Sequence, residues 1–257
     1  MIITDLDRTV IYSHRVTSEY PISKEVESVT VEVKDGMEIG FTSKKMVNWL
    51  KNDTRAVIVA NTARSLMEVE RINISQYFDY IIAANGGVIL HKGKVLSDWE
   101  DYLKREEIQD DLINVHTDIA QLKSSSYKPK IIDRSYVFSK VDNFSLADEE
   151  LDNLRKKYTD FRFVRERNKV YAIPNRVSKL QAMKWLENYL SKEFIIAAGD
   201  SNNDIEMLNY ARVRIVPAHA EIAMNSDIEK RIMPYIKVRS GVDGSEDIVG
   251  IVENILK

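Results

Sequence analysis

The chain has 257 residues, 44% of them apolar, and a formal net charge of −3 at pH 7. This length allows one large domain or two modest ones, and the nearly balanced charge argues against a nucleic-acid or anionic-membrane partner. Without cysteine the chain has no disulfides, thiolate nucleophiles or cysteine-based zinc sites. No apolar stretch approaches the roughly 20 residues needed to cross a bilayer, and the first is too short for a signal peptide. We expect a soluble cytoplasmic protein, as a monomer or small homo-oligomer.

Short apolar runs along the chain indicate buried parallel strands, which need no alternation because both faces of their sheet are covered. The runs are residues 2–3, 56–60, 80–84, 194–198, 213–216 and 235–238. Amphipathic stretches separate most of them, with Ser43 and Ser178 as candidate N-caps and a last helix from about Glu246. Strands that alternate with helices predict an α/β fold with a doubly wound, mostly parallel Rossmann-like sheet.

Residues 12–42 are too long for a simple loop after the first strand. Two β-type runs, 29–33 and 37–41, flank the turn signal at residues 34–36. This pattern predicts a hairpin, and we interpret the segment as a flap over the site.

The strand–helix alternation breaks between residues 86 and 174. This stretch predicts a hairpin at 88–96, a long polar helix at 98–123 and a helix at 147–158. Three further strands are predicted at 136–141, 161–165 and 169–173. We interpret 86–174 as an inserted α+β cap domain, while 1–85 and 175–257 build one core together.

Two carboxylates, Asp5 and Asp7, directly follow the first buried strand. Open α/β sheets bind ligands at the carboxyl ends of their strands, and a spacing of two lets both side chains point the same way. Two like charges so close need a cation or a shared proton, and a divalent ion prefers oxygen ligands. A lone Asp-x-Asp is more often an N-cap or a surface turn, so the motif carries weight only with others.

Three other polar motifs lie after a predicted strand or at a predicted helix start. Gly199 to Asp204 bring Asp200, Asn203 and Asp204 to the end of another buried strand. Thr62 follows the strand at 56–60, where a hydroxyl and backbone N–H groups at a helix start can hold phosphate. Lys179 stands just inside a helix start, where its point charge could bind phosphate oxygens. Ordinary helix capping, or a solvated lysine, is the competing interpretation of each motif alone.

Taken in order, these motifs resemble those of the haloacid dehalogenase superfamily of phosphohydrolases. The insertion lies between the Thr62 and Lys179 motifs, as in the subgroup with a large α/β cap, class IIB. That subgroup is also described as Cof-type or sucrose-phosphatase-like. It includes sugar-phosphate, sucrose-phosphate and mannosyl-phosphoglycerate phosphatases, and phosphomannomutases. Residues 85–87 and 203–208 also resemble this subgroup, and the similarity covers nearly the whole chain.

The resemblance implies a Mg²⁺-dependent phosphatase that acts on a small phosphorylated metabolite. Asp5 would be the nucleophile that forms an aspartyl-phosphate, and Asp7 the general acid and base. Magnesium would be held by Asp5, the backbone carbonyl of Asp7, Asp200 and Asp204, the last directly or through water. Phosphoryl oxygens would be held by Thr62, Lys179 and Asn203.

Two positions depart from the family pattern, because Arg8 and Ala63 stand where glycine is common. Arg8 and Arg64 are candidate substrate contacts, as are Arg165 and Arg167 in the predicted cap. A solvated hairpin is the simpler interpretation of the two cap arginines. The histidines show no metal-binding spacing, and we assign them no role.

Other functions remain open at this point. A phosphomutase would pass the phosphoryl group to a second sugar hydroxyl instead of water. A catalytically silent binding protein would keep the fold without turnover, although all the expected carboxylates are present.

Overall fold

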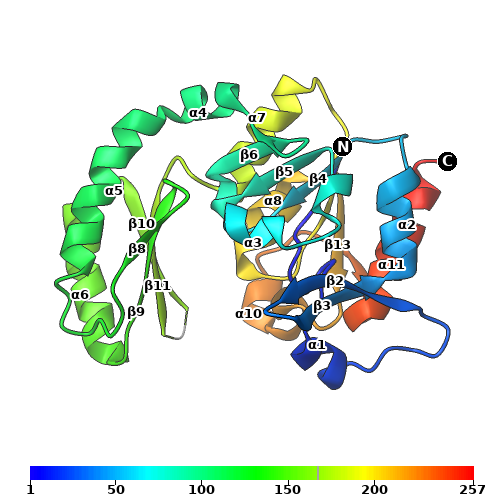
Figure 1. Ribbon diagram of the computed structural model, residues 1–257, viewed down its shortest axis with the longest axis horizontal. Coiled ribbons are helices and arrows are strands. Elements are labelled where there is room, and N and C mark those ends of the chain that lie inside the picture. Colours follow the sequence, from blue (N-terminus) through cyan, green and yellow to red (C-terminus); the bar gives the residue numbers. More distant parts are fainter. Residues whose placement is uncertain (167) are drawn as a thin grey trace.

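The computed structural model describes residues 1–166 and 168–257. Its larger part is an eight-stranded sheet with the order β14-β13-β12-β1-β4-β5-β6-β7 (Figure 1). The strands from β14 to β5 are parallel: β1 (Ile2–Thr4), β4 (Ile58–Asn61), β5 (Tyr80–Ala83), β12 (Ile196–Ala198), β13 (Val213–Pro217) and β14 (Ile236–Val238). Each overlaps an apolar run, so the predicted α/β fold with a mostly parallel sheet is confirmed.

Helices cover both faces of this sheet, because successive side chains of a strand point to opposite faces. Ile2 lies in a buried cluster with apolar residues of α2 and α11, whereas Ile3 lies in a second cluster with residues of α7 and α8. The four helices are α2 (Lys44–Asn52), α7 (Lys179–Tyr189), α8 (Ile205–Tyr210) and α11 (Gly241–Ile255). This two-sided burial is what makes the strands apolar along their whole length.

The predicted N-caps of α2 and α7 are confirmed, but the predicted start of α11 is not. The hydroxyls of Ser43 and Ser178 accept hydrogen bonds from the backbone N–H groups of Met46 and Gln181, as N-caps do. The predicted start of the last helix near Glu246 is wrong, since α11 begins at Gly241. Its first turn is rich in Gly and Ser, which are weak helix formers that hide the start of the helix.

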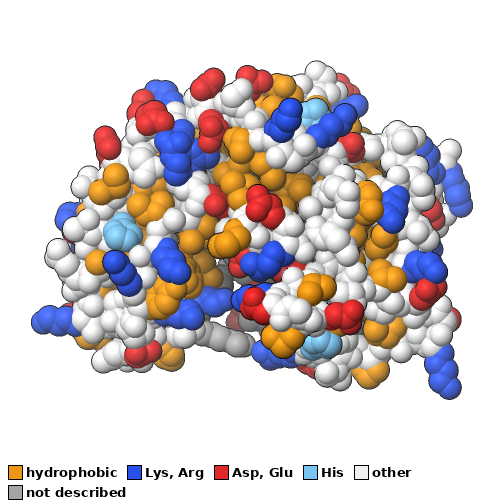
Figure 2. Space-filling model, viewed as in Figure 1, with side chains coloured by type: hydrophobic (Ala, Val, Ile, Leu, Met, Phe, Trp, Pro, Cys, Tyr) orange, Lys and Arg blue, Asp and Glu red, His pale blue; other side chains and the backbone are white. Residues whose placement is uncertain are grey.

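A second, antiparallel sheet forms the smaller part of the molecule, in the order β10-β11-β9-β8. Its strands are β8 (Lys130–Ile132), β9 (Tyr136–Lys140), β10 (Phe161–Glu166) and β11 (Lys169–Pro174). One side of it carries α5 (Arg105–Ile119) and α6 (Phe144–Lys157), at the left of Figure 1. The surface between the two sheets is hollowed, and charged side chains of both signs line the lower end of the hollow (Figure 2).

Two predictions within 86–174 need correction. The hairpin β6 (Val88–His91) and β7 (Lys94–Val95) extends the large sheet instead of the inserted one, because β6 pairs antiparallel with β5. The long helix predicted at 98–123 is two helices, α4 (Ser97–Leu103) and α5. Lys104 separates them in the left-handed region, with φ 51°, a conformation that no pattern of charges reveals.

The remaining elements lie around the large sheet. The predicted hairpin in 12–42 is confirmed as β2 (Ser28–Lys34) and β3 (Met37–Ser43), and α1 (His14–Glu19) precedes it. The short helices are α3 (Leu66–Glu70), α9 (Glu221–Met224), α10 (Ser226–Glu229), η1 (Ser75–Tyr77), η2 (Ala84–Gly86) and η3 (Asn202–Asp204). Within the described ranges, every helix is too short or too polar to span a lipid bilayer.

Candidate active site

The predicted site residues follow the carboxyl ends of neighbouring parallel strands. Asp5 comes directly after β1, and its backbone N–H bonds the carbonyl of Ala198 at the end of β12 (2.9 Å). Asp200 and Asp204 follow β12, and Thr62 follows β4. Since β1 pairs with both β12 and β4, the sheet brings these three segments to one edge.

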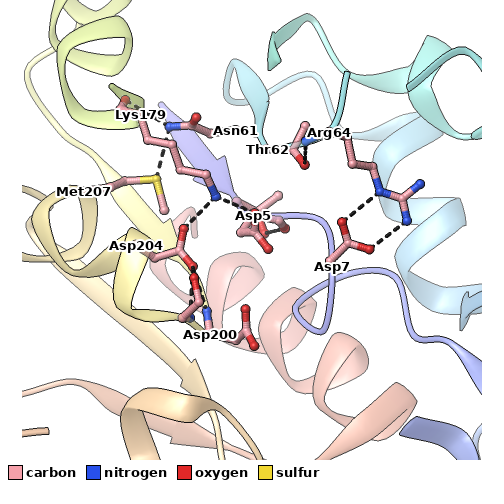
Figure 3. Close-up of polar contacts among 11 residues, drawn as sticks. Asp5, Asp7, Asn61, Thr62, Arg64, Lys179, Asp200, Asp204 and Met207 are labelled. Atoms are coloured by element: carbon pink, nitrogen blue, oxygen red, sulfur yellow. Dashed lines mark hydrogen bonds and ion pairs between the residues drawn. The ribbon is translucent and has the colours of Figure 1, made fainter. Parts of the chain in front are cut away.

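Lys179, the first residue of α7, lies between two of the carboxylates (Figure 3). Its Nζ donates to Oδ1 of Asp5 at 2.6 Å and to Oδ1 of Asp204 at 2.8 Å, and all three side chains are at most 8% exposed. Burial alone would lower the pKa of Lys179, but the negative charges of Asp204 and Asp5 outweigh it and raise that pKa. The lysine therefore remains a cation at every physiological pH.

Asp5, Asp200 and Asp204 form a tight acidic cluster, with one carboxylate oxygen from each within 4.8 Å of the others. Burial, which is the largest cause, and the charges of Asp204 and Asp7 together raise the pKa of Asp5 to about 7 against the attraction of Lys179. Burial, followed by the charges of Asp5 and Asp204, likewise raises the pKa of Asp200 well above its ordinary value. Burial and mutual repulsion thus disfavour the fully ionised form of this cluster.

Asp204 is the most firmly held member of this cluster. Its Oδ2 accepts from the backbone N–H groups of Asp200 (3.2 Å) and Ser201 (3.0 Å) and from the Ser201 hydroxyl (2.8 Å). A Cβ added at Gly199 would lie 2.7 Å from the Asp204 Cβ, so only glycine allows this approach. Asp204 therefore orients Lys179 and shapes the loop that presents Asp200.

The donor set suits a hard divalent cation. Buried carboxylates disfavour one another's ionised form, which is the electrostatic condition that a divalent cation relieves. Their oxygen atoms are the ligands that Mg²⁺ prefers. Asp5 and Asp200 are the better candidates for direct ligands, because Asp204 already accepts hydrogen bonds at both oxygens.

Asp7 lies on the other side of Asp5 and is held by Arg64 (Figure 3). The Nε and Nη2 atoms of Arg64 donate to the two carboxylate oxygens of Asp7 at 2.8 and 2.7 Å. The third arm, Nη1, donates to Oε2 of Glu32 at 2.7 Å. Burial would lower the pKa of Arg64, but its hydrogen bonds and ion pairs with Asp7 and Glu32 raise it. The donors of Arg64 are thus engaged by carboxylates of the protein.

The other predicted contacts differ in position. Thr62 is buried beside the cluster, and its hydroxyl accepts from the backbone N–H of Arg64 at 3.2 Å. Arg8 donates from Nε to Asp200 (3.1 Å) and from Nη2 to the carbonyl of His219 (2.9 Å). Asn203 lies in η3 with an exposed side chain, one residue before the buried Asp204.

Arg165, one of the two predicted cap contacts, is held by residues of the inserted part. Arg165 forms a two-pronged ion pair with Asp148, with 2.7 Å between Nε and Oδ1 and between Nη2 and Oδ2. Its guanidinium also lies 5.2 Å from the centre of the Phe144 ring. Arg165 therefore connects β10 to α6 within the inserted part. Arg167 lies outside the described residues.

Sequence reasoning missed two residues at the site. Glu32, on the hairpin, is 3% exposed and contacts Arg64; its sequence neighbours are ordinary strand residues and gave no signal. Asn61 ends β4, and its Nδ2 donates to the carbonyl of Lys179 at 3.1 Å. A polar residue that ends an otherwise apolar strand was the available signal for Asn61.

The comparisons with known proteins agree with this geometry. The sequence model of the sucrose-6F-phosphate phosphohydrolase family matches residues 1–232. A comparison with curated protein sequences found no match. Solved structures are similar over nearly the whole chain.

The sucrose-phosphatase from Synechocystis sp. PCC6803, solved with sucrose and phosphate, is 18% identical with a TM-score of 0.62, over 98% of this chain and 96% of that one. A haloalkanoate superfamily phosphatase from Bacteroides thetaiotaomicron is 16% identical with a TM-score of 0.59, over 100% and 95%. A haloacid dehalogenase-like hydrolase from Bacillus subtilis is 13% identical with a TM-score of 0.61, over 99% and 91%. At these identities, the structural likeness establishes the shared fold.

The fold and the family match together place the chain among the phosphatases of the haloacid dehalogenase superfamily. Because the match covers most of its length, the protein belongs to the sucrose-6F-phosphate phosphohydrolase family. The resemblance predicted from the motifs is confirmed.

Proposed function

We propose that this phosphatase hydrolyses a small phosphorylated metabolite of the sugar-phosphate class, with Mg²⁺ as cofactor and an aspartyl-phosphate on Asp5 as intermediate. The observation that carries the proposal is the buried Asp5 carboxylate, 2.6 Å from Lys179 and within 4.8 Å of two further carboxylates. An anionic nucleophile in this setting suits attack on phosphorus only if cations surround it.

The residues divide the reaction into two displacements. A carboxylate oxygen of Asp5 attacks phosphorus, the bond from phosphorus to the leaving oxygen breaks, and Asp7 gives that oxygen its proton. Water then attacks the phosphorus of the aspartyl-phosphate, Asp7 takes a proton from it, and inorganic phosphate leaves with Asp5 restored. Lys179, Thr62 and Asn203 would hold the phosphoryl oxygens, where charge must be stabilised.

Asp5, Asp200, Asp204 and the backbone carbonyl of Asp7 would hold the magnesium. When bound, the ion supplies positive charge that offsets the repulsion between the nucleophile and the phosphate dianion. The raised pKa values of Asp5 and Asp200 support this assignment, because burial and mutual repulsion there call for a counter-charge.

The insertion at 86–174, apart from the β6–β7 hairpin that extends the large sheet, is proposed as the cap that selects the substrate. Its separate antiparallel sheet, together with the hollow that faces the large sheet, supports this role (Figure 2). The name of the matching family points to a phosphorylated sugar as substrate, with the sugar itself as leaving group. A cap of this kind would exclude water and contact the part of the substrate that is released.

Phosphate release from a panel of phosphorylated sugars and related metabolites tests the proposal. We expect turnover that EDTA abolishes and Mg²⁺ restores, and no turnover by Asp5→Asn. The matched control is Asp35→Asn, in the exposed turn between β2 and β3, which should retain wild-type activity. More than a few percent of activity in Asp5→Asn would contradict the nucleophile assignment. A need for a sugar bisphosphate before any product forms would instead indicate a phosphomutase.

A further inference from the structure

The β2–β3 hairpin carries one buried acid toward the site. The pairing register shifts on both sides of Glu32, so a β-bulge interrupts the ladder there, and bulges re-aim side chains. Gly40 pairs with Glu32, and a Cβ on Gly40 would lie 2.9 Å from the Glu32 Cβ and 3.3 Å from its Oε2. The missing side chain at Gly40 leaves room for the carboxylate, which is 3% exposed.

The bulge is fastened to the core beside α3. The backbone N–H of Asn73 donates to the carbonyl of Val31 at 2.9 Å, and Glu32 forms an isolated bridge with Ile72. Arg71 adds a second cation, with its Nη2 3.3 Å from Oε1 of Glu32. The position of Glu32 is therefore set by backbone contacts as well as by its two arginines.

Arg64 connects this fixed carboxylate to Asp7. Its guanidinium is planar and donates two parallel hydrogen bonds to Asp7, while its third arm donates to Glu32. Two bonds to Asp7 align the carboxylate with the guanidinium plane. The bond to Glu32 stops that plane from turning and holds it to the hairpin.

Asp7 needs such support because its side chain is 54% exposed. A general acid must lie within hydrogen-bond reach of the leaving oxygen, and a misplacement of about 1 Å can cost about 10² in rate. We infer that Glu32 is a positioning residue of the active site, which fixes Arg64 and through it Asp7. The β2–β3 hairpin would then contribute to catalysis by carrying Glu32. The inference rests on the proposed role of Asp7.

Leaving-group dependence tests this positioning role. Protonation matters most when a poor leaving group, an alkoxide, departs, and least for para-nitrophenolate. The value of kcat/KM reports the steps up to leaving-group departure, so hydrolysis of the aspartyl-phosphate does not mask the effect. We would measure kcat/KM for a primary alkyl phosphate and for para-nitrophenyl phosphate, well below the melting temperature of each variant.

Glu32→Gln should lower kcat/KM about tenfold or more for the alkyl phosphate and less than about threefold for the aryl phosphate. Arg64→Lys, which keeps the charge but loses the two-pronged bond, should show the same selective loss and serves if Glu32→Gln does not fold. Glu38→Gln, an exposed position on the same hairpin, is the control and should keep the wild-type ratio.

Asp7→Asn, measured with the same two substrates, separates the positioning role of Glu32 from the acid–base role of Asp7. If Asp7→Asn shows the selective loss and the Glu32 and Arg64 variants lose both activities equally or neither, the positioning role is refuted and the proposed function stands. If Asp7→Asn itself shows no selectivity, the acid–base role of Asp7 fails, and the inference about Glu32 fails with it.

Discussion

Replacing Lys179 by Met probes the electrostatic balance of the acidic site most directly. The substitution removes one buried cation but keeps an unbranched chain of similar volume, so packing changes little. What remains is a pair of buried carboxylates, Asp5 and Asp204, that were 2.6 and 2.8 Å from the lost ammonium. The variant should be both inactive and less stable.

The size of the stability loss follows from these distances. At an effective dielectric constant of about 20, contacts of 2.6 and 2.8 Å each correspond to roughly 6 kcal/mol of gross attraction. Desolvation of the charges offsets much of this, and breaking a buried pair typically costs about 3–5 kcal/mol net. The loss should be smaller at pH 5 than at pH 8, because Asp5, with a pKa raised to about 7, is then protonated.

Urea unfolding in EDTA at the two pH values measures this loss. The matched control is Lys184→Met on the same helix, where the ammonium lies over the Tyr210 ring and about 1 kcal/mol is at stake. Adding Asp204→Asn to Lys179→Met should recover part of the stability, since it removes one unpaired charge. If Lys179→Met unfolds at the same urea concentration as Lys184→Met at pH 8, the lysine does not hold this cluster together.

Two further predictions concern the metal-free protein and Arg8. Between the ordinary pKa of 3.8 and the raised value of about 7, folded Asp5 keeps a proton that the unfolded chain releases. Stability in EDTA should therefore fall as pH rises through this range, by more in the wild type than in Asp5→Asn. Melting temperatures from pH 4 to 8 measure this; equal slopes would contradict it. Arg8→Gly should bind Mg²⁺ about fivefold more tightly by calorimetry, because a half-exposed ion pair worth about 1 kcal/mol no longer competes for Asp200. Unchanged or weaker binding would show that Arg8 does not compete.

The parallel sheet could be predicted because each of its strands is marked by its own short apolar run. A strand covered on both faces must be apolar throughout, and the runs containing Ile58 and Ile196 show this without reference to distant residues. The site followed from the same feature, since residues after parallel strands meet at one edge. This feature predicts that Asp5 and Asp200 are neighbours, whereas Lys179, at a helix start, joins them only through the resemblance to the family.

Other parts depend on tertiary contacts that no local pattern contains. The break at Lys104 is a single left-handed residue, and neither its charge nor its neighbours mark it. The β6–β7 hairpin was assigned to the insertion because it follows the turn at residues 85–87, yet its pairing partner is β5. Glu32 resembles any strand residue until the bulge directs it to Arg64.

The two sheets share more than a linker. One continuous buried cluster contains Ile3 of β1, Trp99 of α4, Leu112 of α5 and Val170 of β11. The Trp99 indole N–H donates to the carbonyl of Gly86, and Arg105 donates to that of Gly87, in the turn between β5 and β6 of the large sheet. The two sheets are therefore joined by a packed apolar cluster as well as by the linking chain. A motion of the proposed cap would have to bend this buried apolar cluster, so its packing would limit how far the hollow between the two sheets can open.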